Sequence, residues 1–375
     1  TASCFVTVGK LFATLFGWDY GVMMIIGAII VFLYTFMGGY LSVCTTDLVQ
    51  GTLMFLALAT VFIGSVTAAG GVENTVTFLQ NIPGFLSGTE IATPLLDEAG
   101  NQLIEGNEPM FGPAGTYGII TIVSGLAWGL GYFGQPHILV RFMGISSPQA
   151  IKKSRRIATV WVLISLTAAI MIGVSGRMFL GDGLLLNDGN QETIYINMVA
   201  KIFPVFIAGI FLSAILAAIM STADSQLLVT ASALTEDFYH NKVHKNASEK
   251  ELMWVSRGCV MAVAIIAVLI ATNQNSTILG LVSYAWGGFG SAFGPLVLCS
   301  LFWRRTNKQG AYAGIIVGGV VDLVWAQLSG GIFDLYEIVP GFVFGLLAIV
   351  VVSLLTPAPT KAVTDEFDSY HHCVE

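Results

Sequence analysis

The stretch WGLGYFGQPHILVRF, residues 128–142, ends an apolar segment that is long enough to cross a lipid bilayer. The segment as a whole, 117–142, exceeds the ~20 residues that a straight helical crossing needs. Gly129, Gly131, Gly134 and Pro136 stand inside it. Glycine loosens a helix and proline removes a backbone donor, so we expect an interruption here. A bilayer tolerates an interruption only where the backbone faces protein or a water-filled cavity.

The side chains beside the expected interruption favour a binding site. Trp128, Tyr132 and Phe133 are large aromatics, and Gln135 carries an amide, a combination that suits a small zwitterion with an apolar ring or chain. Interrupted helices near the membrane midplane bind solutes and ions in transporters. A proline kink in a packing helix, with the aromatics as filler, is the alternative that this stretch leaves open.

The composition assigns the chain to the membrane. Its 375 residues are 55% hydrophobic and 10% charged, with a mean hydropathy of +0.79, which excludes a soluble domain with a solvated surface. We therefore expect an all-α polytopic membrane protein with a single transmembrane domain over 1–375. After a partial span at its start, nine complete spans are expected, at 23–43, 48–68, 117–142, 157–176, 205–234, 254–271, 278–302, 311–327 and 338–355.

The charged residues predict which loops face the cytoplasm. The 70–113 loop holds six acidic residues and no Lys or Arg, whereas the next loop, RFMGISSPQAIKKSRR (141–156), is strongly basic. By the positive-inside rule the first is extracellular and the second cytoplasmic, and alternation then places the 356–375 tail in the cytoplasm. Thirteen of the sixteen Lys and Arg residues fall inside, and the three left outside are Lys10, Arg177 and Lys201.

The span at 205–234 carries a face of small and hydroxylated residues. Ser213, Ala217, Ser221 and Ser225 recur every four residues, and Ala214, Ala218 and Thr222 form the neighbouring stripe. The hydroxyls of Ser221 and Thr222, together with backbone carbonyls, are suitable ligands for a hard monovalent cation such as sodium. A small-residue packing face without an ion is the alternative.

Two aspartates near span ends are candidates for an ion pathway. Asp224 follows Thr222 closely, and a carboxylate inside a span is costly enough to suggest a function. A hydrated position near the cytoplasmic end is the other possibility for Asp224. Asp47 leaves the same pair of interpretations open, as an ion-pathway residue or a hydrated helix cap.

Several motifs in this order resemble the solute:sodium symporter family. They are GLAWGLGYFGQPHILVRFM (125–143), LSAILAAIMST (212–222), LGLVSYAWGGFG (279–290) and LYEIVPGFVFG (335–345). A family signature is complete at Ser300, Leu301, Arg305, Gly310, Ala311, Gly314 and Gly318. A second, around LYTFMGGYLS (33–42), departs at Tyr40, where the family has Leu, Met or Phe.

The resemblance covers nearly the whole chain and implies a leucine-transporter-like fold of two inverted five-helix repeats. On that mapping the Trp128 stretch is the sixth core helix, the Ser221 span the eighth and 279–302 the tenth. The resemblance also implies that the chain begins within the third core helix. The expected fold is therefore incomplete at the N-terminus, and the first core helix, with its share of both sites, is missing.

Matching positions imply roles for individual residues. Trp128, Tyr132 and Pro136 correspond to the proline-site positions of family members that carry proline. Ala218, through its carbonyl, and Ser221 and Thr222 correspond to the sodium ligands. Asp47 corresponds to an aspartate near the inner mouth that is linked to sodium-dependent transport, and Asp224 stays a candidate from the residues alone.

The function implied by the resemblance is sodium-coupled uptake of L-proline by alternating access in a bacterial cytoplasmic (inner) membrane. Sodium is then the coupling ion, and no cofactor, nucleic acid or obligate protein partner is expected. The sequence shows no nucleophile–base constellation or phosphate loop, so an enzyme is not expected. Symport of another small solute (pantothenate, a sugar or a carboxylate) and a membrane sensory module with this fold are the alternatives.

Overall fold

The computed structural model describes residues 1–97, 103–105, 108–180, 190–273 and 277–374. The chain divides into two compact units: unit 1 comprises Thr1–Thr116 and Ile145–Leu281, and unit 2 comprises Tyr117–Gly144 and Val282–Glu375. Within the described residues, seven helices are long and apolar enough to cross a membrane. Seven of the nine complete spans expected from the sequence overlap with one of these helices, and the helices at 117–142 and 311–327 fall outside the seven.

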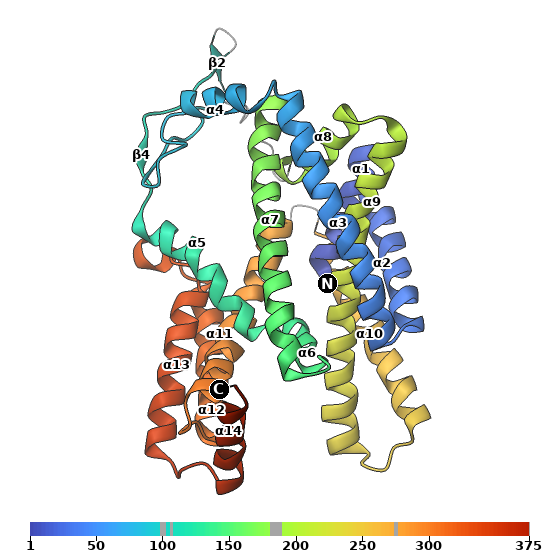
Figure 1. Ribbon diagram of the computed structural model, residues 1–375, viewed down its shortest axis with the longest axis vertical. Helices are drawn as coiled ribbons and strands as arrows, with labels where there is room; N and C mark the ends of the chain where they lie inside the picture. Colours follow the sequence, from blue (N-terminus) through green and yellow to red (C-terminus); the bar gives the residue numbers. More distant parts are fainter. Residues whose placement is uncertain (98–102, 106–107, 181–189, 274–276, 375) are drawn as a thin grey trace. The chain divides into compact units, whose positions relative to one another are not determined.

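Unit 1 is built mainly from helices (Figure 1). They are α1 (Ala2–Phe16), α2 (Tyr20–Met37), α3 (Tyr40–Ala68), α4 (Val72–Asn81), α7 (Pro148–Leu180), α8 (Ile194–Ile202), α9 (Val205–Ser232) and α10 (Glu249–Ala271). Helix α9 continues as a π-helix, η4 (Ala233–Val243). The predicted extracellular loop contains α4 and the short strands β1 (Glu90–Ile91), β2 (Ile104–Glu105) and β3 (Glu108–Pro109), and β1 pairs with β4 (Gly115–Thr116).

The boundary between α2 and α3 differs from the hydropathy pattern. The apolar run predicted a span at 23–43, but α2 ends at Met37 and α3 begins at Tyr40. Gly38 and Gly39 between them are extended, with ψ of 175° and −179°. Hydropathy alone does not locate this helix end, because the residues on both sides of Gly38 and Gly39 are apolar. The turn follows from the two adjacent glycines.

Helix α9 belongs to both hydrophobic cores of unit 1. In one core, Phe5 of α1, Met24 of α2 and Leu227 of α9 are fully or almost fully buried and pack with α10. In the other, Val61 of α3 and Val199 of α8 pack with α7 and the N-terminal part of α9. Small residues on several faces of α9 let these neighbours approach closely, which explains its central place in the unit.

Unit 2 consists of α5 (Ile119–Gly131), α6 (Pro136–Met143), α11 (Ile278–Phe302, whose first residues lie in unit 1), α12 (Lys308–Trp325), α13 (Ile338–Leu355) and α14 (Lys361–Val374). Helices α12 and α13 lie side by side (Figure 1). A side chain on Gly314 would collide with Ile349 of α13, and one on Gly318 would collide with the backbone oxygen of Ser291 of α11. The signature glycines thus serve close helix packing in this unit.

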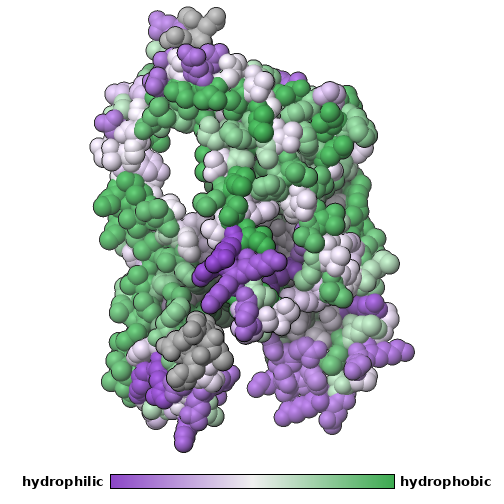
Figure 2. Space-filling view, in the orientation of Figure 1, coloured by the Kyte–Doolittle hydropathy of each residue, from purple (hydrophilic) through white to green (hydrophobic). Residues whose placement is uncertain are grey.

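The helix surfaces are those of a multi-pass membrane protein. Large hydrophobic side chains such as Ile29, Leu48, Ile63 and Leu163 are more than half exposed along the long helices. Figure 2 shows hydrophobic residues covering the lengths of the helices and hydrophilic ones gathered at the η4–α10 hairpin. So much exposed apolar surface is unfavourable in water but favourable in contact with lipid.

Candidate functional site

The stretch quoted first is interrupted, as its sequence predicts. Helix α5 ends at Gly131, a 3₁₀ turn follows at Tyr132–Gly134, and α6 starts at Pro136. Gln135 between them is extended, with φ −82° and ψ 111°. A residue before proline is driven out of the helical region, and proline fits the first position of a helix, where no backbone donor is needed. The interruption is therefore local in origin.

Trp286 of α11 forms hydrogen bonds with residues on both sides of this break. Its indole Nε1 donates to the carbonyl of Trp128 at 2.9 Å, and its own carbonyl accepts from Gln135 Nε2 at 3.3 Å. Gln135 is only 3% exposed. A side chain on Gly131 would collide with the Trp286 indole, and one on Gly134 would collide with the carbonyl of Phe289. The glycines thus let α11 approach closely enough for Trp286 to bond the Trp128 carbonyl and the Gln135 side chain.

Aromatic rings line the break. The rings of Trp128 and Trp286 stack with centroids 5.2 Å apart, and Tyr132 meets Trp286 edge-on at 4.8 Å. Tyr336, just before α13, stacks on Trp128 at 6.4 Å and donates its hydroxyl to the carbonyl of Ser283 at 2.6 Å. Tyr132 keeps 43% of its surface exposed. We call Trp128, Tyr132, Trp286 and Tyr336 the aromatic cluster.

The three residues predicted to bind the solute lie together, and Trp286 and Tyr336 pack beside them. Trp128, Tyr132 and Pro136 all lie at the break, in one unit. Trp286 and Tyr336 were not singled out as site residues, although both fall in motifs that carry the family resemblance. Those motifs were the available signal, since no local pattern reports a contact made from α11 to α5.

The predicted sodium residues lie in unit 1 on α9. The Ser221 hydroxyl donates to the Ala218 carbonyl at 3.2 Å, so two of the three candidate ligand oxygens are adjacent. Two ligands about 2.4 Å from one ion stand about 3.4 Å apart when they meet at a right angle. Thr222, the third candidate, is exposed on the same helix. The spacing of Ala218 and Ser221 suits two neighbouring ligands of one small cation.

Two carboxylates meet at Ser225, one turn further along α9. The Ser225 hydroxyl lies 3.4 Å from Asp47 Oδ2, 3.3 Å from Asp224 Oδ1 and 2.8 Å from the Ser221 carbonyl. Asp224 is fully buried among the described residues. The structure therefore brings both predicted pathway aspartates together, and Ser225, recognised in the sequence only as part of the small-residue face, joins them.

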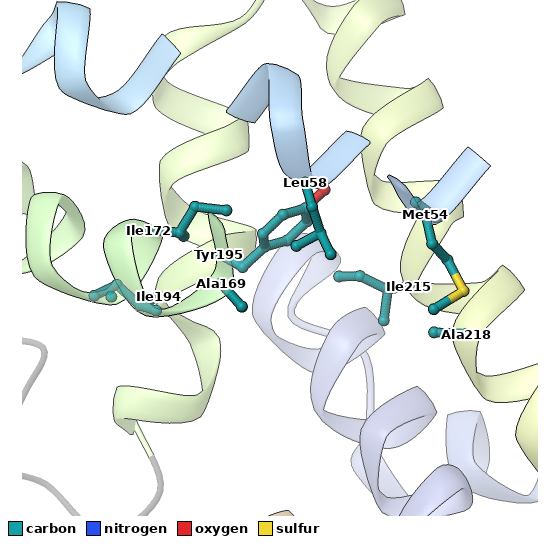
Figure 3. Close-up of a pocket in the computed structure, with 10 residues that line it drawn as sticks. Met54, Leu58, Ala169, Ile172, Ile194, Tyr195, Ile215 and Ala218 are labelled. Carbon is teal, nitrogen blue, oxygen red and sulfur yellow. The ribbon is translucent and has the colours of Figure 1, made fainter. Parts of the chain in front are cut away.

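A cavity of about 330 Å³ opens beside Ala218 (Figure 3). Its walls come from α3, α7, α8 and α9, and Met54, Leu58, Ile172 and Ile215 make them largely apolar. Tyr195 contributes its ring, and its hydroxyl is bound to the Phe211 carbonyl at 3.2 Å. Burial raises the pKa of Tyr195, so its hydroxyl stays protonated and holds this bond.

Relatives of known description align with nearly the whole chain. It is 44% identical over 373 residues to the high-affinity proline transporter PutP of Bacillus subtilis (strain 168), covering 98% of this chain and 72% of that one. It is 41% identical over 377 residues to the sodium/proline symporter of Salmonella typhimurium (strain LT2), covering 99% of this chain and 70% of the relative.

The fold and a family profile agree with these relatives. A solved structure of the substrate-bound, outward-open state of a Na⁺-coupled sialic acid symporter superimposes with a TM-score of 0.70 at 22% identity, covering 96% of this chain and 71% of that one. This likeness confirms the expected leucine-transporter-like helical fold. A profile of the sodium:solute symporter family matches residues 1–318, and this chain therefore belongs to the sodium:solute symporter family.

Proposed function

We propose that this protein takes up L-proline together with sodium by alternating access. The observation that carries the proposal is the identity of 44% and 41%, over nearly the whole chain, to relatives described as proline transporters. The interrupted helix and its aromatic cluster support it, because a discontinuous helix supplies polar backbone groups at membrane depth and aromatic rings pack against an apolar ring.

In this proposal the aromatic side of the break receives the solute. The faces of Trp128 and Tyr132, with the ring of Pro136, contact the pyrrolidine ring of proline. Trp286 and Tyr336 position these residues through their stacking and hydrogen bonds. Helix α6 begins at the break, and the positive end of its dipole there suits the carboxylate of the solute.

Sodium is the co-transported ion in this proposal, held by the Ala218 carbonyl and the hydroxyls of Ser221 and Thr222. When sodium binds, the hydroxyl hydrogen of Ser221 rotates away from the Ala218 carbonyl, so that the Ser221 and Ala218 oxygens both face the ion. Asp47 and Asp224 lie one turn further along, where carboxylates attract a cation that enters or leaves. Each sodium that enters a negatively charged cell gains roughly 2.3 kcal/mol per 100 mV, which drives the uphill movement of the solute.

Labelled-proline uptake into membrane vesicles tests the proposal, using the full-length protein with and without an inward sodium gradient. Loss of a hydrogen-bonding group to a charged partner costs about 1.5–3 kcal/mol, so Ser221→Ala and Thr222→Ala should each weaken sodium activation roughly 10- to 100-fold. Thr230→Ala is the matched control, because the Thr230 hydroxyl donates a hydrogen bond to the Gln226 carbonyl on the same helix and lies outside the proposed ion site.

Each result of this experiment bears on a separate part of the proposal. Uptake that needs no sodium gradient would contradict the coupling. Unchanged sodium activation in both alanine variants would contradict the ion site while leaving transport in place. Competition by pantothenate, sugars or carboxylates as strong as that by unlabelled proline would contradict the assignment of the solute.

We further propose that the protein lies in the bacterial cytoplasmic membrane with the 70–113 loop outside and the C-terminus inside. In a cysteine-free background, Thr89→Cys should react with a membrane-impermeant maleimide added to intact cells, whereas Lys250→Cys should react only after permeabilisation. Both positions are exposed in the structure, so reactivity reports the side of the membrane. The opposite labelling pattern would show that the charge bias assigned the orientation wrongly.

A further inference from the structure

A buried carboxylate in unit 2 has no part in the proposed transport sites. Asp322 of α12 is fully buried in the apolar sequence VVDLVW. Its Oδ1 accepts a hydrogen bond from the Ser291 hydroxyl of α11 at 2.8 Å. Its Oδ2 is also buried and has no hydrogen-bond partner within the residues that the structure describes. A charged carboxylate with one oxygen unsatisfied is costly in such surroundings.

A second carboxylate approaches the same point. A Cβ atom on Gly287 of α11 would lie 3.1 Å from Asp322 Oδ1 and 3.4 Å from Oε1 of Glu337, which stands just before α13. A Cβ on Gly288 would lie 3.7 Å from Asp322 Oδ2, the unpartnered oxygen. The absence of side chains at these two glycines therefore leaves a space against α11, and both carboxyl groups lie beside it.

The other helices around this space supply no positive charge, and Lys308 of α12 itself lies 14 positions before Asp322. Helices α11 and α13 contain no Asp, Glu, Lys, Arg or His, and neither does α5. The titratable groups near it are Tyr336 and Glu337 before α13 and Tyr284 of α11, and the Tyr336 hydroxyl already donates to the Ser283 carbonyl. Two carboxylates that converge in an apolar setting do not both remain ionised.

We propose that Asp322 and Glu337 form a proton-binding site that takes up one proton from the medium. The proton neutralises one of the two charges. It also supplies a hydrogen-bond donor to the buried carboxyl pair, whose Asp322 Oδ2 has no hydrogen-bond partner among the described residues. A sodium ion would need a shell of about six oxygens. The distances at this point bring together two carboxyl groups and the Ser291 hydroxyl, fewer oxygens than that shell requires, so we assign a proton rather than a sodium ion to this site.

Residues of the proton site are next in sequence to two members of the aromatic cluster. Gly287 follows Trp286 in α11, and Glu337 follows Tyr336, which stacks on Trp128. Loss of the proton leaves two negative charges that repel each other across Gly287, and this repulsion acts on both Trp286 and Tyr336. The proton site is independent of the proposed function, but its effect on proline uptake rests on that function.

Infrared difference spectroscopy of the purified full-length protein in lipid tests the site without any transport. Acidification should produce the C=O absorption of a buried carboxylic acid, and Asp322→Asn should remove it. Asp334→Asn is the matched control, because Asp334 lies in the same unit but is exposed and should leave the absorption unchanged. If wild type and Asp322→Asn give the same difference spectrum, the proposal is overturned.

Two further variants should shift the titration in opposite directions. Glu337→Gln removes the neighbouring charge, so more acid should be needed to protonate Asp322. Ser291→Ala removes the hydroxyl that stabilises the ionised carboxylate, so the proton should persist to higher pH. If sodium chloride, but not choline chloride, abolishes the absorption at constant pH, the site takes sodium and the proton assignment is wrong.

Uptake measurements then test the link to the aromatic cluster. The KM for proline should vary with external pH in the wild type and should lose this variation in Asp322→Asn. A flat profile in the wild type, together with a confirmed infrared titration, would overturn the link alone. Absence of proline uptake at every pH would instead contradict the proposed function and leave the infrared result untouched.

Discussion

A Gly134→Ala variant should lose sodium-dependent proline uptake, with a reduction of roughly 100-fold or more. The added methyl group would collide with the carbonyl of Phe289 and lie 2.9 Å from the Cα of Gly290, both of which are backbone atoms of α11. Backbone cannot turn aside as a flexible side chain can, so α11 must move away from the break. That movement would separate Trp286 from the Trp128 carbonyl and the Gln135 amide, its two hydrogen-bond partners at the break.

Gly129→Ala is the matched control for this variant. Gly129 lies in the same short stretch, but a Cβ there would have nothing within 4 Å. Labelled-proline uptake, normalised to the amount of protein in the membrane, should therefore be close to wild type for Gly129→Ala. Equal uptake by the two variants would mean that the close approach of α11 to the break is not needed for transport.

A Trp286→Phe variant should raise the KM for proline by roughly 10- to 100-fold. Phenylalanine keeps an aromatic ring beside Trp128 and Tyr132 but has no Nε1 to donate to the Trp128 carbonyl. A buried carbonyl left without its partner costs about 1–3 kcal/mol. We expect this cost to loosen the end of α5, where Trp128 and Tyr132 contact the solute.

Trp325→Phe provides the control for the general effect of removing an indole donor. Trp325 belongs to the same unit and donates to the Leu335 carbonyl at 3.0 Å, outside the aromatic cluster. Its variant should keep the wild-type KM. The KM for proline of each variant is measured from uptake at a saturating sodium concentration. If Trp286→Phe and Trp325→Phe have the same KM, Trp286 does not position the residues that bind the solute.

The interruption at Gly131–Pro136 was predictable because its causes are local. Pro136 restricts the residue before it and cannot donate a backbone hydrogen bond, wherever the helix lies in the protein. The small face of α9 was predictable for a similar reason, since residues four apart share one side of any helix. The turn at Gly38 was missed because the apolar run continues through it.

The partners of these elements were not predictable from spacing. Ser225 meets Asp47 across 178 residues of chain, and Trp286 meets Trp128 across 158. No periodicity relates positions that are so far apart. The family motifs marked the segments in which Trp286 and Tyr336 lie, but they did not show which atoms meet.

The sequence by itself determined that this chain crosses a membrane through interrupted and uninterrupted helices, and where the interruption falls. These properties follow from hydropathy and from the backbone limits of glycine and proline, which act within a few residues. Only the tertiary structure decided that α11 supplies the hydrogen-bond partners of Trp128 and Gln135 and that Asp322 is buried beside Glu337. Such contacts depend on which helix faces pack together, and that choice is made by the shape of the whole unit.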